Sequence, residues 1–141
     1  MFRRLTTFLR LLIPPRKLDP SRVVVRQLRP DDLERFFPPR ELPLAEKWLA
    51  MQERGEIYIA VAEVDGASVG RRCLNLQEYA AIGVVYGFAA SVLPQWRSRG
   101  VGAMLDAHSE AVALAKGFRA IRCSVGADIA AAHEGSARAR R

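Results

Sequence analysis

The sequence predicts a single α/β domain. Its 141 residues are 50% hydrophobic and 26% charged, which is sufficient for one hydrophobic core of ordinary size. Runs rich in β-branched residues alternate along the chain with runs whose apolar residues recur at helical spacing. The pair Asp65-Gly66 separates two of the strand-like runs and is typical of a β-hairpin turn. We therefore expect a strand, two helices, three strands, a helix and a final strand.

Proline and glycine residues bound most of these elements. The β-branched runs VVVRQL and IYIAVAEV indicate strands, and DDLERFF begins with an Asp suited to a helix N-cap. The apolar residues of AMLDAHSEAVALAK fall along one side of a helix that Gly117 ends. In chain order, the expected elements are a strand at 23–28, helices at 31–37 and 43–54, strands at 57–64, 67–76 and 82–93, a helix at 103–116 and a strand at 119–125.

The net charge of +7 lies at the two ends of the chain. Residues 1–29 hold eight basic residues and one acidic residue, whereas residues 30–132 hold 11 basic and 13 acidic residues. Because the body has no basic stripe interleaved with aromatic residues, we expect no specific nucleic-acid binding. We interpret residues 1–22 as a basic amphipathic extension outside the core, and residues 133–141 as a basic disordered tail. A membrane-surface helix or an organelle presequence stays open for the extension, as does tail-driven binding to nucleic acid or membranes.

Cysteine usage and hydropathy exclude several other classes of protein. Cys73 and Cys123 are the only cysteines and lie far apart, so the sequence suggests neither a disulfide framework nor a metal site. No apolar run reaches the roughly 18 residues that a membrane-spanning helix needs. We therefore expect a cytoplasmic protein without a transmembrane segment.

The segment SVLPQWRSRGVGAML, between a predicted strand and a predicted helix, indicates an anion site. The start of a helix leaves backbone N–H groups unpaired, and the helix dipole favours an anion there. Gly100 and Gly102 allow close approach of the backbone and unusual φ values, while Arg97 and Arg99 supply positive charge. The segment lacks the Lys-Ser/Thr pair of a P-loop and the glycine spacing of a dinucleotide-binding fingerprint. We therefore expect a phosphate site of another kind.

This segment resembles the signature of the GNAT acyltransferase superfamily, Arg/Gln-x-x-Gly-x-Gly/Ala, which residues 97–102 match. The sequence around it is also similar to the family pattern. The further matches are a Val-x-Pro strand end at 92–94, the aromatic Trp96, a helix ending in Gly117-Phe118, and Asp128 with Ala131 in place of Asn-x-x-Ala.

The resemblance covers about residues 23–132 and implies a partial acyl-CoA-binding N-acetyltransferase domain. The implied fold is a GNAT-like α/β fold whose mixed, mainly antiparallel sheet is flanked by helices. The implied reaction transfers an acetyl group from the cosubstrate acetyl-CoA to a primary amine of a small molecule or peptide. The loop amides would cradle the pyrophosphate, and the pantetheine arm would run beside the preceding strand. The residues implied to bind acetyl-CoA are Ser91, Val92, Leu93, Arg97, Ser98, Arg99, Gly100, Val101, Gly102 and Asp128.

Glu78 and Tyr86 are the candidates for activating the amine, near the strand or through a water. We assign structural roles, and no catalytic role, to the other polar and aromatic candidates. His108 and Trp96 are expected to pack, Cys123 to lie in the core, and Arg71 and Arg72 to be solvated at the surface.

The chain departs from the family pattern after residue 132. No tyrosine follows Tyr86, no late Gly-Phe pair occurs, and Asp128 stands where the family usually has Asn. We therefore expect a sheet that lacks the last strands of the family, with an open edge that favours a homodimer. Three alternatives stay open: a shortened or frame-shifted end, a site completed by a partner, or a degenerate non-catalytic acyl-CoA-binding or interaction module.

Overall fold

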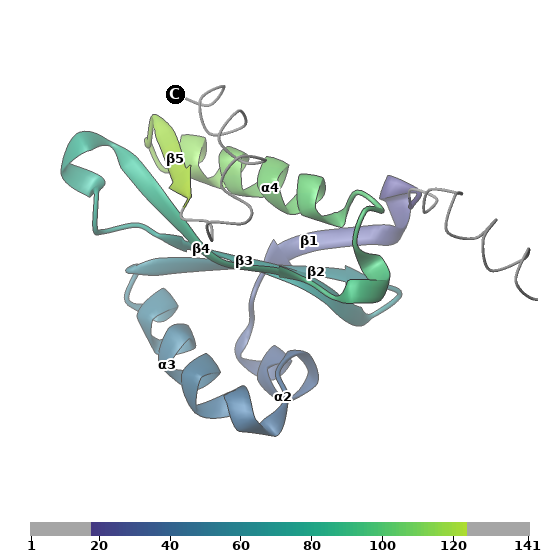
Figure 1. Cartoon of the computed structure of the whole chain (residues 1–141). Coiled ribbons are helices and arrows are strands. Elements are labelled where there is room, and N and C mark those ends of the chain that lie inside the picture. The colour runs from purple at the N-terminus through teal and green to yellow at the C-terminus, as the bar shows by residue number, and fades with distance from the viewer. Residues whose placement is uncertain (1–17, 124–141) are drawn as a thin grey trace, which may run out of the picture.

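The computed structural model describes residues 18–123, which form a five-stranded sheet with helices on both faces (Figure 1). The strands lie in chain order, and neighbours are antiparallel except for the last pair, which is parallel. The predicted mixed, mainly antiparallel sheet flanked by helices is therefore confirmed. The strands are β1 (Val23–Gln27), β2 (Ile57–Val64), β3 (Ala67–Asn75), β4 (Val84–Val92) and β5 (Ala120–Cys123).

The helices are α2 (Leu33–Phe36), α3 (Leu42–Glu53) and α4 (Val101–Ala115). The first helix is shorter than predicted because a 3-10 turn occupies Pro30–Asp32, and Pro38 keeps the preceding Phe37 in an extended conformation. Helix α4 begins two residues earlier than predicted, directly after Gly100. The connection between β4 and β5 therefore runs through α4, as a parallel pair requires.

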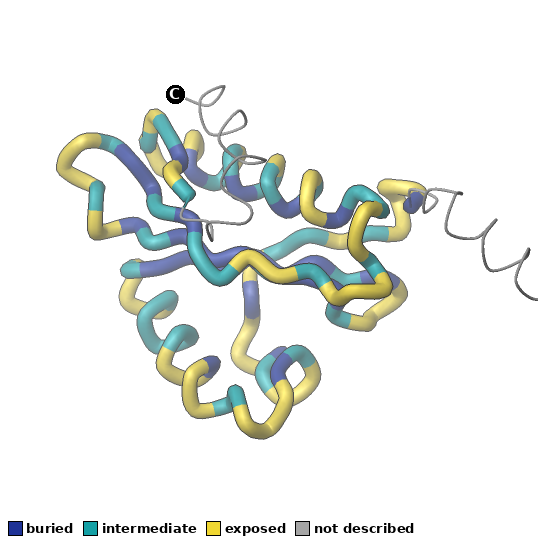
Figure 2. Tube along the Cα trace, in the orientation of Figure 1, coloured by how far each residue is buried: buried dark blue, intermediate teal, exposed yellow. Residues whose placement is uncertain are grey.

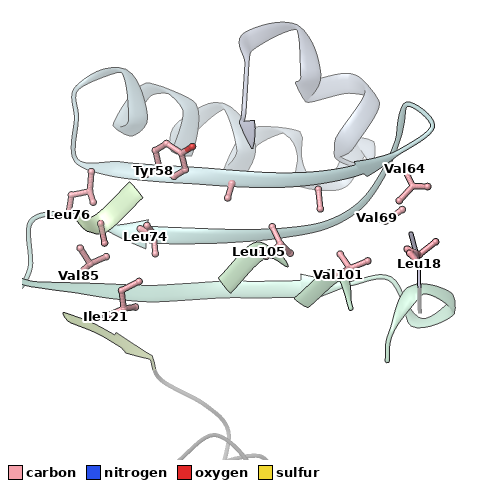
Figure 3. Close-up of a cluster of buried hydrophobic side chains, with 13 residues drawn as sticks. Leu18, Tyr58, Val64, Val69, Leu74, Leu76, Val85, Val101, Leu105 and Ile121 are labelled. Carbon is pink, nitrogen blue, oxygen red and sulfur yellow. The ribbon is translucent and has the colours of Figure 1, made fainter. Parts of the chain in front are cut away.

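The helices divide between the two faces of the sheet. Helix α4 covers one face, and α2 and α3 cover the other (Figure 1). The strands between them are largely buried, whereas the outer surfaces of the helices are exposed (Figure 2). On the α4 side, Val101 and Leu105 of the helix meet apolar side chains of the strands (Figure 3). A second cluster of buried side chains lies on the face that α2 and α3 cover, and it includes Phe37, Ala45, Ile59, Val61 and Cys73.

Leu18 corrects the predicted boundary of the N-terminal extension. The segment 1–22 was expected to lie outside the core, yet Leu18 is only 6% exposed and packs in the α4-side cluster (Figure 3). Its N–H donates to the Arg99 carbonyl at 3.1 Å. Leu18 therefore belongs to the folded domain. The remaining predictions for residues 1–17 and for the tail at 133–141 lie outside the described residues.

Strand β4 contains a β-bulge near its middle. Arg71 of β3 opposes Ser91, but Cys73 opposes Phe88, so β4 has one more residue than β3 between these pairs. Within the bulge, Ala89 has a φ of 52°. A bulge bends a strand and leaves a residue out of the ladder, so the end of β4 is redirected relative to its beginning.

Candidate functional site

Within the described residues, β5 pairs with only the first part of β4. The pairs run from Val84 and Ala120 to Gly87 and Cys123, which is the last residue described, whereas β4 continues to Val92. On its other side, β4 stays paired with β3 to its end. Within the described residues, the β5-side edge of residues 88–92 therefore has no strand partner. Such an edge can accept an extended ligand as an added strand.

This open edge leads directly to the N-terminus of α4. A 3-10 turn at Pro94–Trp96 follows β4, and Gly100 then serves as the N-cap with a φ of 99°. A residue with a side chain would be strained at this φ. The first-turn N–H groups of α4 have no acceptor within the helix, and the helix dipole makes this end positive. A helix N-terminus therefore lies where the sequence predicts the anion site.

The prediction of an unusual φ is wrong for Gly102. It lies within α4 and does not have the positive φ that the sequence suggested for both glycines, because the helix starts before it. A Cβ at this position would meet no atom within 4 Å. Gly102 therefore leaves open space in front of the first turn of the helix.

Two arginines lie beside this helix start. The Nε of Arg97 donates to the Val92 carbonyl at 3.0 Å, which holds the exposed side chain against the end of β4. The guanidinium of Arg99 lies 4.6 Å from the centre of the Trp96 ring. Trp96 packs against the α4-side core, as predicted. Both positive charges are thus held within the loop that precedes α4.

The other residues implied to bind acetyl-CoA differ in exposure. Ser91 and Leu93 are exposed, Val92 packs partly on the core, and Ser98 is exposed with a φ of 59°. The Val101 side chain is buried, so only its backbone can serve a ligand. Asp128 lies outside the described residues.

The structure brings Glu78 and Tyr86 to the same end of the sheet. Glu78 is exposed, and its N–H donates to Asn75 Oδ1 at 3.1 Å. Asn75 is the β3 partner of Tyr86, and the Tyr86 ring lies 6.0 Å from that of Tyr79. Tyr86 lies five residues before Ser91, which is roughly 17 Å along an extended strand. The two candidates therefore lie at the opposite end of β4 from the loop.

Arg72 is buried, which contradicts the prediction of a solvated side chain. It is 4% exposed, forms an ion pair with Asp106 of α4 and donates a hydrogen bond to Cys123 Sγ. The absence of a side chain at Gly87 makes the room, because a Cβ there would lie 2.9 Å from Arg72 Nη2. Cys123 was expected in the core; it packs against the core but is only partly buried.

Arg71 also departs from the prediction, because its side chain is only 25% exposed. Its guanidinium carbon lies 5.1 Å from the Phe37 ring centre and 5.6 Å from that of Trp48. The signal that could have located it is strand alternation, since Arg71 shares a face with Cys73, which packs against α3. Its aromatic partners come from a distant segment, and nothing in the local sequence around Arg71 identifies them.

A groove of about 850 Å³ adjoins Arg71 on the α2 side of the sheet. Its walls come from residues 34–41, from residues 66–71 around the β2–β3 turn, and from Ser91 and Leu93 at the end of β4. The groove therefore reaches the same stretch of β4 that leads to the loop before α4.

His108 is packed, as predicted. Its Nε2 lies 2.7 Å from the Tyr58 hydroxyl, and this contact joins α4 to β2. Burial lowers the pKa of His108 below its ordinary value and raises the pKa of Tyr58.

No group of three or more His, Cys, Asp or Glu side chains in residues 18–123 is placed to hold a metal ion. No helix in the same range is long and apolar enough to cross a membrane.

The comparison with family models decides how this geometry is classified. The model of the acetyltransferase (GNAT) family matches residues 23–134. The chain belongs to the GNAT acetyltransferase family. A comparison with curated proteins found no match.

Solved structures share this GNAT fold. A Trypanosoma brucei acetyltransferase is 21% identical with a TM-score of 0.65, over 81% of this chain and 90% of its own. AAC(6')-Iy, in complex with the bisubstrate analogue CoA-S-monomethyl-acetylneamine, is 21% identical with a TM-score of 0.66, over 84% of this chain and 88% of its own. PaiA N-acetyltransferase from Thermoplasma acidophilum, in complex with coenzyme A, is 14% identical with a TM-score of 0.64, over 83% and 87%. At these identities the likeness shows the fold.

Proposed function

We propose that this GNAT protein transfers an acetyl group from acetyl-CoA to a primary amine. The observation that carries the proposal is the continuous path from the open edge of β4 to the positive N-terminus of α4. The path combines a strand edge for an extended amide-bearing arm with a helix terminus for phosphates. The coenzyme A complexes of PaiA and AAC(6')-Iy support it, because those proteins have the same fold.

In this proposal the backbone provides most of the binding. The amides of residues 98–102 contact the pyrophosphate, and Arg97 and Arg99 supply positive charge beside it. The edge at Ser91 to Leu93 pairs with the pantetheine arm, while Val101 contributes its N–H and Gly102 the open space. Asp128 stays a prediction from the family pattern.

The chemistry follows from the arrangement along β4. The amine nitrogen attacks the thioester carbonyl, the C–N bond forms and the C–S bond breaks, and the sulfur leaves as a thiolate. A backbone N–H in the bulge at Ala89 is suited to donate to the developing oxyanion, because the bulge takes a residue out of the ladder. Glu78 or Tyr86, directly or through a water, accepts the proton that the attacking ammonium loses.

The first test is thermal stability with ligand. Acetyl-CoA at 100 times its dissociation constant should stabilise the protein by about 2.7 kcal/mol, which raises the melting temperature. A melting temperature that millimolar acetyl-CoA leaves unchanged would overturn the proposal. The second test is amine-dependent release of free thiol from acetyl-CoA. Binding without any amine-dependent thiol release would identify a non-catalytic module instead of an enzyme.

A further inference from the structure

The groove beside Arg71 is placed to receive the acceptor, if the proposed function holds. It lies on the face of the sheet opposite α4, between residues 34–41 and the strands. Ser91 and Leu93 of β4 form part of its wall, and the same residues belong to the open strand edge. A molecule in the groove would therefore lie next to the path proposed for the pantetheine arm.

Arg71 is a largely buried charged side chain of this groove whose hydrogen-bond donors are unused. A guanidinium carries five N–H donors, yet Arg71 makes no hydrogen bond to any described residue, and its Nε is fully buried without a partner. Its contacts are the faces of Phe37 and Trp48. The closest approach of the Glu41 carboxylate is to Nη1, at 3.6 Å, which is longer than a hydrogen bond of about 2.9 Å.

Besides Arg71, the charged residues of the groove are two arginines and two glutamates. The guanidinium of Arg35 is already engaged, by Asp32 at 3.0 Å and Glu63 at 3.8 Å. Arg40 is exposed at the groove and has no ion-pair partner among residues 18–123. Glu34 and Glu41 are the acidic residues of the lining, and Glu41 is already beside Arg71. Arg40 and Arg71 would oppose a polycation there, whereas Glu34 and Glu41 would attract it, so the unused donors of Arg71 are what distinguish this groove.

We propose that the acceptor is an amine that also carries an anionic group, a carboxylate or a phosphate, and that Arg71 binds this group through its unused N–H donors. The aromatic rings hold the guanidinium in place without occupying its donors, so the arginine is ordered before the ligand arrives. The anion supplies the acceptors that the protein does not. With the anion held at Arg71, the amine of the same molecule can extend along the groove toward β4.

The test uses matched acceptors that differ only in the anionic group. The pairs are L-phenylalanine with L-phenylalanine amide, and glucosamine 6-phosphate with glucosamine; spermidine serves as a polycation. The anionic member of at least one pair should have a kcat/KM at least tenfold higher than its neutral partner. The pair that shows the preference distinguishes a carboxylate from a phosphate.

Variants of Arg71 test whether this side chain causes the preference. Arg71→Gln should reduce the ratio of kcat/KM between the anionic and the neutral acceptor to about one, and Arg71→Lys, which keeps the charge, should retain part of it. Arg54→Gln removes a charge from an exposed surface pair with Glu56 and should leave the ratio unchanged.

A binding measurement tests Arg71 without turnover. N-acetyl-L-phenylalanine and its amide, or N-acetylglucosamine 6-phosphate and N-acetylglucosamine, are titrated in the presence of coenzyme A by tryptophan fluorescence. The anionic member should bind at least tenfold more tightly to the wild type and not to Arg71→Gln. If acetyl-CoA stabilises the protein but neutral or polycationic acceptors are preferred, or no anionic member binds, the inference is overturned and the proposed function is not. If acetyl-CoA does not bind, the proposed function fails, and the inference fails with it.

Discussion

Asp32 is a buried carboxylate that joins β1 to the start of α2. It is 1% exposed and accepts hydrogen bonds from Arg26 at 2.7 and 2.9 Å, from Arg35 at 3.0 Å and from the Arg29 N–H at 2.7 Å. The hydrogen bonds of Arg26 contribute most to lowering its pKa from 3.8 to about 2. The segment that forms one wall of the groove is thus anchored by a charge network.

We expect this network to make the fold sensitive to acid. The folded pKa lies below the unfolded one, so the carboxylate stabilises the fold above pH 3.8 and this contribution is lost as the pH falls toward about 2. A shift of this size corresponds to about 2 kcal/mol. Asp32→Asn should lower the free energy of unfolding at neutral pH by about 3 kcal/mol, because it removes the buried one of the two carboxylates that pair with Arg26. Urea denaturation at a series of pH values measures this, and the exposed Asp31→Asn should change little. Equal effects of the two variants would contradict the assigned role of Asp32.

Gly102 allows ligand binding to be separated from stability. It is helical and faces open space, so Gly102→Ala should keep the fold and raise its stability by about 0.5–1 kcal/mol. The added methyl group occupies space proposed for the pyrophosphate, and Gly102→Glu adds a negative charge there as well. We expect calorimetry to show at least tenfold weaker acetyl-CoA binding for Ala and no binding for Glu. Glu substitution without loss of affinity would place the phosphates elsewhere.

The local sequence motif located one part of the candidate site, the loop before α4. It did not reveal the surroundings of Arg71 and Arg72, for a physical reason. Gly100, Arg97 and Trp96 lie close together in the chain, so a short motif contains the loop and its helix start. Arg71 and Arg72 acquire their environments from residues distant in the chain, and their exposure cannot be read from neighbours in sequence. Charged side chains are mostly exposed, which is why both were expected at the surface.

At the scale of single elements, the bulge in β4 contains an alanine in the left-handed region. A side chain at the φ of 52° of Ala89 costs roughly 1 kcal/mol relative to glycine. Ala89→Gly should therefore be neutral or stabilising by up to about 1 kcal/mol. The neighbouring exposed Ala90 has an ordinary φ, so Ala90→Gly should destabilise by about 0.5–1 kcal/mol. Thermal unfolding of the two variants measures the difference, and the opposite order would mean that the bulge does not exist in solution.

The contact between Tyr58 and His108 attaches α4 to β2, and the His108 imidazole in it can take up a proton. Burial lowers the folded pKa of His108 below the 6.5 of the unfolded chain, so the unfolded chain takes up a proton first. The contribution of the neutral, buried His108 to the stability of the fold is complete above pH 6.5 and declines as the pH falls below it. His108→Gln should remove this part of the pH dependence while leaving acetyl-CoA affinity unchanged. An affinity loss in His108→Gln without a change in the pH profile would assign His108 to the ligand site instead.

Element boundaries were predictable where turn residues or a helix-ending glycine mark them in the sequence. The turn Asp65-Gly66 and the glycine after α4 place β2, β3 and α4 within two residues of their expected bounds. The β4 bulge was not expected, because an extra residue in one strand is defined only by its pairing with β3. The same holds for the groove, whose walls come from three separate segments.

At the scale of the whole molecule, the proposed ligand contacts only one part of the sheet. Hydrogen exchange should slow on adding acetyl-CoA for amides of residues 88–92 and 97–103, while β1 and β2 stay unchanged. The reason is that the first set lies along the open edge and the helix start, and the second set is already paired on the far side. Mass spectrometry of peptides after exchange measures this. Protection confined to other segments would contradict the proposed path.

The hydrogen bond from Leu18 to Arg99 has a consequence for synthesis of the chain. Leu18 is translated before the first strand, whereas the loop that contains Arg99 is made only after four strands have been translated. The contact therefore forms late, since ordering the intervening chain has an entropic cost that local contacts do not have. Until then, an apolar side chain of the nascent polypeptide stays in water and is available to chaperones. The loop that forms part of the proposed phosphate site is thus completed by a residue translated before all the strands, and a fusion partner attached on the N-terminal side must leave that residue free to pack against the loop.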